Sequence, residues 1–253
     1  MTSKSLIAIL LTMIILLASF PMMNEIDVGG VDGDFGGGSG TEDDPFVIED
    51  VWDLQAMKDN LSAHFILGND IDASETESWN DGAGFVPIGE SYYHMEGWSE
   101  EPFTGSLDGS DHIISDIFIY HEQADIYRTM LSIGLFGYIG SEGSVIDLEM
   151  TGSNIEVNST SGASIGGLVG YNEGSISNCI FRGSITGMTA AGGLIGSNLG
   201  TVVNCHSDVE VEDTGEIGNI GGLIGVNDGI VSDSSSTGIV SGSFYTGGLI
   251  GLN

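Results

Sequence analysis

The sequence is short of basic residues, cysteine and proline, and each shortage argues against a class of protein. Only 4 Lys and Arg face 37 Asp and Glu, for a formal net charge of -33. Nucleic acid is therefore not an expected partner, because phosphate contacts need a basic surface. The 2 cysteines have no second pair and no histidine at ligand spacing, which argues against a zinc site. The 4 prolines stand beside 41 glycines, and glycine at fixed offsets indicates repeated turns.

The acidic excess has more than one interpretation. Self-repulsion of this size should loosen a compact state at low ionic strength, whereas salt screens it and divalent cations bridge neighbouring carboxylates. A halophilic origin and local calcium binding are the two explanations that follow. The simpler interpretation is that the carboxylates only form a solvated surface.

The N-terminal part of the sequence predicts export. Lys4 precedes an apolar run, so residues 1–23 have the form of a secretory signal peptide, with an uncleaved anchor as the alternative. No other segment is long and apolar enough to span a membrane, so any membrane contact is expected through this segment alone. Residues 24–44 are rich in Gly and Asp and predict an acidic, flexible linker. We expect the protein outside the cell or at its surface, where the sequons at Asn60 and Asn158 would be open to glycosylation.

Folded material is expected from residue 45 onward. Residues 45–102 predict an N-terminal cap and a first coil, in which a short strand at residues 46–48 is followed by a short helix with Asp50 as its N-cap. A small helix beside an edge strand would cover the first open face of a stack of repeats.

One phrase recurs in residues 103–253. The stretches GGLVGYNEGSISNC, GGLIGSNLGTVVNC and GGLIGVNDGIVSDS repeat it, and the chain ends on GGLIGLN. A spacing of about 26–31 residues between copies is typical of a solenoid. Apolar fragments of two to four residues between Gly and Asn are too short for helices. The predicted fold is all-β, a parallel β-helix with coils of about 26–31 residues and a small N-terminal strand-helix cap.

Aligned copies predict columns of stacked side chains. One inward column holds Ile114, Val145, Ile176, Val202 and Val231. A second holds Ile117, Leu148, Cys179, Cys205 and Ser234. Asn and Asp tolerate left-handed backbone and supply the bend between the columns. The predicted structural ladder consists of Asn172, Asn178, Asn198, Asn204, Asn227 and Asp233.

The repeated phrase resembles the GLUG motif, a glycine-rich repeat of bacterial and archaeal surface proteins and adhesin-like polypeptides. The resemblance covers about residues 45–253 and implies an exported β-helical surface protein without shared catalytic residues. The expected function is a non-catalytic adhesive or binding module, with a glycan or a surface protein as partner. The alternatives are a polysaccharide-active hydrolase or lyase and a structural surface-layer spacer.

Three groups of residues are candidate sites. Asp108, Asp111 and His112 would suit acid and base catalysis, but Asp and Gly also favour turns, and a uronate lyase would be short of cations here. Cys179 and Cys205 occupy one column, so they are either a disulfide between coils or two small buried residues. One acidic loop is a candidate Ca²⁺ site, the only expected cofactor, or merely a charged loop. Its carboxylates are Asp70, Asp72, Glu75, Glu77 and Asp81.

Overall fold

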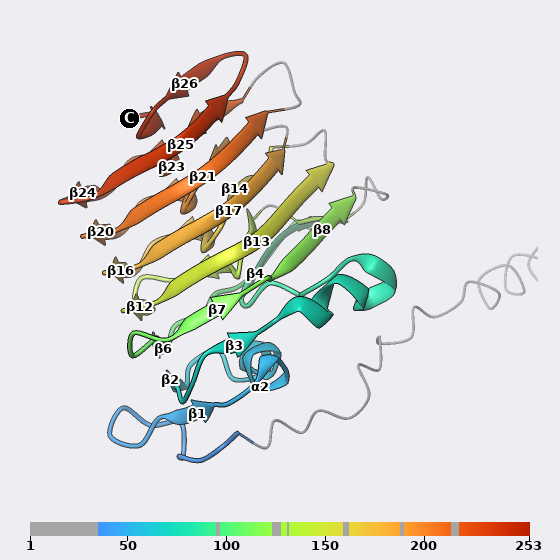
Figure 1. Ribbon diagram of the computed structural model, residues 1–253, viewed down its shortest axis with the longest axis vertical. Helices are drawn as coiled ribbons and strands as arrows, with labels where there is room; N and C mark the ends of the chain where they lie inside the picture. Colours follow the sequence, from blue (N-terminus) through green and yellow to red (C-terminus); the bar gives the residue numbers. More distant parts are fainter. Residues whose placement is uncertain are drawn as a thin grey trace, which may run out of the picture. The chain divides into compact units, whose positions relative to one another are not determined.

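The described residues form a stack of parallel β-strands, as predicted (Figure 1). The computed structural model describes residues 35–94, 97–122, 128–130, 132–158, 162–187, 190–213 and 218–253. The predicted signal peptide, residues 1–23, and the first part of the predicted linker lie outside the described residues.

Four parallel sheets build each complete coil, and they are numbered in the order in which the chain visits them. Sheet 1 consists of β1 (Phe46–Ile48), β2 (His64–Leu67), β6 (Ser106–Asp108), β12 (Ser144–Ile146), β16 (Ser175–Ser177), β20 (Thr201–Val203) and β24 (Ile230–Ser232). Sheet 2 consists of β3 (Ile71–Asp72), β7 (Ile113–Ser115), β8 (Phe118–Glu122), β13 (Glu149–Asn158), β17 (Ile180–Gly187), β21 (His206–Asp213) and β25 (Ser235–Ser241).

Two shorter sheets complete the coil, and a hairpin lies beside it. Sheet 3 consists of β10 (Ser132–Ile133), β14 (Ser164–Gly166), β18 (Ala190–Gly192), β22 (Asn219–Gly221) and β26 (Tyr245–Gly247). Sheet 4 consists of β11 (Phe136–Ile139), β15 (Val169–Asn172), β19 (Ile195–Asn198), β23 (Ile224–Asn227) and β27 (Ile250–Leu252). Sheet 5 is antiparallel, with β4 (Glu90–His94) between β5 (Gly97–Glu101) and β9 (Arg128–Met130).

The register of sheet 1 confirms most of the first predicted column. Val145 pairs with Ile176, Ile176 with Val202, and Val202 with Val231. The first three are fully buried, and Val231 is partly buried against the same core. Stacking identical or similar β-branched side chains on one inner face keeps the core continuous from coil to coil.

The prediction is wrong for the lowest member of each predicted column, Ile114 and Ile117. Leu107, not Ile114, pairs with Val145, and Ile114 pairs with Met150 in sheet 2. The cause is a second bend at Asp116, whose φ of 60° matches the 53° of Asp147. Residues 114–117 therefore repeat the apolar-x-Asp-apolar pattern of residues 145–148, but they lie one strand later in the coil, between β7 and β8, and Ile117 is not a member of the second column.

The repeated phrase GGLIG forms a corner at which two sheets approach closely. A Cβ on Gly192 would lie 2.0 Å from the carbonyl oxygen of Ile195, and one on Gly196 would lie 2.4 Å from the amide nitrogen of Ile165. Only glycine fits contacts this short against backbone atoms. Leu194 and Ile195 between these glycines are completely buried. The phrase is therefore structural, because its glycines admit neighbouring backbone and its apolar residues fill the core.

Asparagines form a buried ladder along sheet 4. Asn172 Nδ2 donates to Asn198 Oδ1 at 2.8 Å, and Asn198 Nδ2 donates to Asn227 Oδ1 at 2.8 Å. Asn227 Nδ2 continues the chain of bonds to Asn253 Oδ1 at 2.7 Å. Asn172 and Asn198 are fully buried, so each amide replaces its lost water contacts with the amide of the next coil.

A second ladder runs along the outer bend between sheets 1 and 2. Asn204 Nδ2 donates to Asn178 Oδ1 at 2.8 Å, and Asn178 Nδ2 donates to Asp147 Oδ1 at 2.7 Å. Asp147, Asn178, Asn204 and Asp233 have φ of 53°, 56°, 53° and 52°. The left-handed backbone predicted for these Asn and Asp positions is confirmed, and it turns the chain from one sheet into the next.

A short helix covers the first coil. The helix α2 (Val51–Ala56) is followed by the 3₁₀ turn η1 (Met57–Asp59), and η2 (Ser74–Ser78) and η3 (Asn80–Gly82) come later in the chain. The N-cap prediction is confirmed, because Asp50 Oδ1 accepts from the amides of Trp52 and Asp53 at 2.9 Å. Leu54 and Met57 are fully buried beneath this helical segment. None of the helices in the described residues has the length and hydropathy needed to cross a bilayer.

The end of the predicted linker packs against the first strand. Within residues 35–44, the Gly36 amide donates to the carbonyl of Val47 at 2.9 Å. The ring of Phe35 stacks on that of Phe46 with centroids 4.4 Å apart. Phe35, which lies between Asp34 and three glycines, is the one large apolar residue within residues 35–44. Its packing shows that folded structure begins ahead of residue 45.

Candidate ligand-binding pocket

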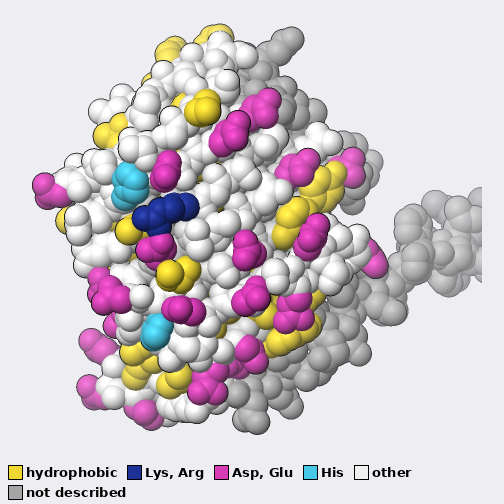
Figure 2. Space-filling view, viewed as in Figure 1, with side chains coloured by type: hydrophobic (Ala, Val, Ile, Leu, Met, Phe, Trp, Pro, Cys, Tyr) yellow, Lys and Arg dark blue, Asp and Glu magenta, His cyan; other side chains and the backbone are white. Residues whose placement is uncertain are grey.

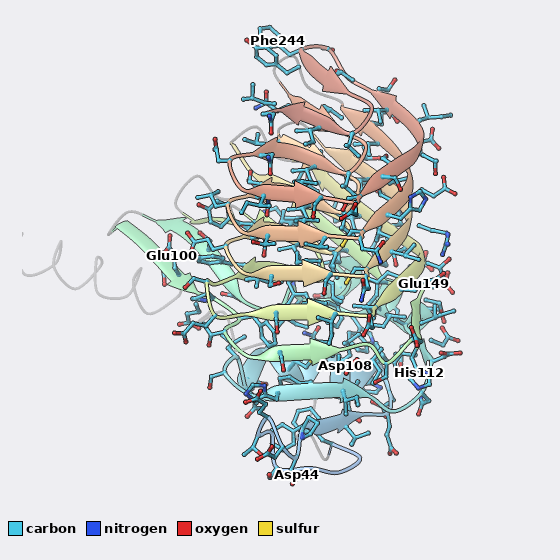
Figure 3. All side chains as sticks on the ribbon, turned by 90° about the vertical axis from the view of Figure 1, so that its left-hand side faces the viewer. Asp44, Glu100, Asp108, His112, Glu149 and Phe244 are labelled. Atoms are coloured by element: carbon cyan, nitrogen blue, oxygen red, sulfur yellow. The ribbon has the colours of Figure 1, made fainter. Side chains whose placement is uncertain are left out.

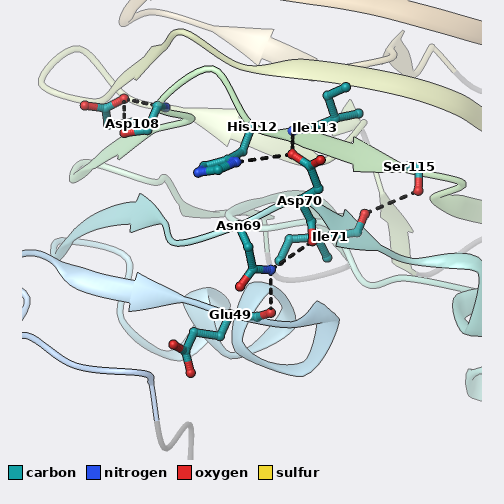
Figure 4. Close-up of polar contacts among 9 residues, drawn as sticks. Glu49, Asn69, Asp70, Ile71, Asp108, His112, Ile113 and Ser115 are labelled. Carbon is teal, nitrogen blue, oxygen red and sulfur yellow. Dashed lines mark hydrogen bonds and ion pairs between the residues drawn. The ribbon is translucent and has the colours of Figure 1, made fainter.

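The predicted acid and base group is not assembled around one point. His112 Nδ1 lies 3.2 Å from Asp70 Oδ1, and Asp108 Oδ1 instead accepts from the Ser110 amide at 2.7 Å (Figure 4). Ser110 and Asp111 have φ of 49° and 61°, so this stretch is a tight turn. The turn interpretation explains these residues, and the structure gives no catalytic arrangement to the three residues of this candidate group.

The carboxylates of the candidate calcium loop do not converge either. Asp70 accepts from the Ile113 amide at 3.0 Å, and these two hydrogen bonds, from Ile113 and His112, lower the pKa of the Asp70 carboxyl. Asp72 accepts from the Ser74 amide at 2.9 Å, which likewise lowers its pKa. Within the part of the chain that the structure describes, no three His, Cys, Asp or Glu side chains are placed to hold a metal ion.

The two cysteines are free thiols in the structure, so the disulfide alternative is not the arrangement observed. Both are buried, and Cys179 Sγ donates to the carbonyl of Ser177 at 3.3 Å while Cys205 Sγ donates to that of Val203 at 3.4 Å. These residues occupy the inward column that Leu148 also shares. Side chains stacked in parallel register point the same way, which does not suit the dihedral angle that a disulfide requires.

The glycosylation sequons lie at the surface. Asn60 ends the turn η1, and Asn158 ends β13, and both residues are exposed. Glycosylation at these two positions remains a prediction.

A cavity of about 280 Å³ lies between the hairpin of sheet 5 and the side of the solenoid. The hairpin contributes Ser91 and Glu100, which are direct cross-strand partners. Figure 3 shows Glu100 at the side of the stack, away from the turn that carries Asp108 and His112. The described lining residues are Ser91, Glu100, Ser132, Tyr138, Gly162, Ser164 and Tyr171.

Parallel pairing brings matching residues into the wall of this cavity. Ser132 is the partner of Ser164 in sheet 3, and Tyr138 is the partner of Tyr171 in sheet 4. The Ser164 hydroxyl also lies 2.8 Å from that of Ser197, which joins the outer faces of sheets 3 and 4. The wall is thus a row of hydroxyls beside a pair of aromatic rings, each repeated one coil apart.

The two tyrosines pack edge to face, and carboxylates surround them. Their ring centroids are 5.2 Å apart with an interplanar angle of 78°, and Tyr138 Oη donates to Glu173 Oε2 at 2.8 Å. Burial first, and then the negative charges of Glu173 and Glu100, raise the pKa of both phenols. The phenols therefore stay protonated and act as neutral rings with hydroxyl donors, while the carboxylates carry the charge of the site.

Sequence reasoning missed this pocket. Tyr138 and Tyr171 lie in neighbouring repeats, and aligning the copies does place them in one column, but the adjoining Ser91 and Glu100 come from a hairpin outside the repeats. The one sign along the chain is a pair of aromatic residues in the outward column of sheet 4, where the next coil carries Ser197 instead.

The fold and the register define a parallel β-helix whose coils are built from one glycine-rich phrase. The family model described as "The GLUG motif" matches residues 161–186. That match confirms the predicted GLUG motif in these residues, and the repeat register confirms the predicted β-helical fold.

Two curated proteins resemble the chain over more than half of its length. Halomucin from Haloquadratum walsbyi is 35% identical over 153 residues, which cover 59% of this chain and 2% of halomucin. A provisionally named Gly-rich membrane protein from Evansella cellulosilytica is 34% identical over 148 residues, covering 57% of this chain and 15% of that protein. The chain thus spans only a small fraction of the length of either relative.

A solved structure also resembles this one. The crystal structure of a provisionally named immunoglobulin A1 protease from Bacteroides ovatus matches with a TM-score of 0.48 and 19% identity. The match covers 85% of this chain and 73% of that one.

Proposed function

We propose that this protein is a non-catalytic binding module of the cell surface or the extracellular space, and that its pocket between sheet 5 and the solenoid binds a sugar. The observation that carries the proposal is the edge-to-face pair of tyrosines beside a row of serine hydroxyls. Sugars present apolar ring faces edged by hydroxyls, and protein pockets recognise small ligands with aromatic surface and a few fixed polar groups.

The likenesses support the surface location. One relative is named halomucin and the other a Gly-rich membrane protein, and both names belong to proteins of which this chain matches one part. A rigid solenoid holds its side faces in fixed register, which suits it to present a binding pocket away from its own attachment point.

The large acidic surface supports an extracellular setting as well. Figure 2 shows carboxylates spread over one face of the molecule with few basic side chains among them. Such a surface stays hydrated, and salt screens the repulsion among its carboxylates.

The first experiment is binding of the full chain to a glycan array, followed by calorimetry with any sugar that is retained. Tyr171→Ala should weaken binding about tenfold, because an aromatic contact contributes roughly 0.5–1.5 kcal/mol beyond its buried area. Tyr245→Ala is the matched control, since Tyr245 is 53% exposed and lies outside the pocket.

Two results would contradict the proposal. Retention of no glycan would favour the spacer alternative, in which the solenoid serves only as a structural element. Equal binding by both alanine variants and the unchanged chain would place the sugar elsewhere on the surface.

A further inference from the structure

The pocket carries negative charge in addition to its edge-to-face pair of tyrosines. Glu100 lines it from the hairpin, and Glu173, behind the lining residue Tyr138, accepts a hydrogen bond from the Tyr138 hydroxyl at 2.8 Å. Both carboxylates, and Asp228 as well, are close enough to Tyr171 to influence its phenol electrostatically. None of the described residues that line the cavity is basic, so nothing among them neutralises these charges.

Part of the wall beside those charges is buried, although Glu100 itself is exposed. Tyr138 is 7% exposed and Ser132 is 3% exposed, so part of the wall is screened from water. An ion bound in such a partly dry site interacts more strongly with its neighbours than it would in bulk solvent. The faces of the two rings add a further attraction for a cation through their quadrupoles.

We infer that the pocket selects a positively charged sugar, an amino sugar whose amine is free and protonated. This inference rests on the proposed function and specifies the ligand class of the same site. The ammonium group would lie beside the carboxylate of Glu100 and against the tyrosine rings, within the field of Glu173, with the sugar hydroxyls directed toward the serines. Acetylation of the amine removes the charge that Glu100 and Glu173 favour, so the acetylated sugar should bind less tightly.

The test is isothermal titration calorimetry of the full chain with three sugars at one ionic strength. Glucosamine should bind about tenfold more tightly than N-acetylglucosamine or glucose, at a pH where its amine is protonated. The Glu100→Gln and Glu173→Gln variants should each reduce this preference, so that the three sugars bind with more nearly equal affinity. Glutamine at position 173 still offers an oxygen to the Tyr138 hydroxyl, so this variant removes charge while keeping the hydrogen bond.

The chain as a whole attracts cations, and the control must separate that effect from the pocket. Glu156→Gln makes the same change on the exposed outer face of sheet 2, outside the pocket, and should leave the preference unchanged. A preference that survives undiminished in both pocket variants would overturn the inference, because it would then reflect the net charge alone.

The remaining outcomes distinguish the two proposals. Equal binding of all three sugars, lost in Tyr171→Ala, would overturn charge selection and leave the sugar-binding function in place. Binding of none of the three by the unchanged chain, together with an array that retains no glycan, would overturn both.

Discussion

The buried asparagine ladder offers a direct test of what holds neighbouring coils together. Asn198 is fully buried, accepts from Asn172 Nδ2 at 2.8 Å and donates to Asn227 Oδ1 at 2.8 Å. Asn198→Leu replaces the amide with an apolar side chain of moderately larger volume that can make neither bond. It leaves one donor on Asn172 and one acceptor on Asn227 without their partners in the ladder.

The expected destabilisation is a substantial fraction of the stability of a typical domain. A buried polar group that loses its partner costs about 1–3 kcal/mol, so two such groups cost about 2–6 kcal/mol. The Asn172 Nδ2 donor keeps a 3.4 Å contact with the carbonyl of Gly174, which is too long to replace the lost bond. Native proteins are stable by only about 5–15 kcal/mol, so a loss of this size is readily measured.

Urea unfolding followed by circular dichroism at fixed salt measures this loss. Asn219→Leu is the matched control, because Asn219 holds an outward, half-buried position on β22, and its effect should stay within about 0.5 kcal/mol. Solenoids can unfold in segments, so the first cooperative transition is the one to compare. An Asn198→Leu variant as stable as the unchanged chain would refute the view that the amide ladder stabilises the stack.

Three further perturbations test the register, the corners and the charge. Val202→Asp buries an unpaired carboxylate and should lower the free energy of unfolding by about 3 kcal/mol or more. Asp228→Ser at an exposed turn should leave it nearly unchanged. Equal urea midpoints for the two variants would count against the register. Gly196→Ala places a methyl group 2.4 Å from a backbone nitrogen and should lower the free energy of unfolding by about 1–3 kcal/mol. In Gly248→Ala the new methyl group meets no atom within 4 Å, so this variant should be tolerated. Similar urea midpoints for the two variants would contradict the close approach of backbone at the glycine corner. Because the described carboxylates do not converge, CaCl₂ should raise the melting temperature no more than NaCl of matched ionic strength, and extra stabilisation at micromolar calcium would show a specific site.

Repetition makes the upper coils predictable. Equivalent residues in successive copies fall in equivalent places, so aligning the copies is enough to assign Val145, Ile176 and Val202 to one inward column, and the strand register confirms it. Asn and Asp at the bends follow from their tolerance of left-handed backbone, which the φ values confirm.

The lowest coils are less predictable, because one local pattern can mark two different bends. Residues 114–117 and 145–148 share the apolar-x-Asp-apolar pattern, but the first lies at a bend within sheet 2 and the second at the bend between sheets 1 and 2. The repeat alignment therefore predicts Ile114 in sheet 1, while the structure places it in sheet 2.

Sequence alone determined the architecture of this protein, because the spacing of glycine, asparagine and apolar residues repeats with the coil and each of these residues acts through local geometry or nearest-neighbour stacking. Tertiary structure alone decided where the pocket lies. Tyr171 gains its pocket surroundings only when the hairpin carrying Glu100 lies beside the stack. Contacts between a repeat and a segment outside the repeats have no period, so no pattern along the chain could report them.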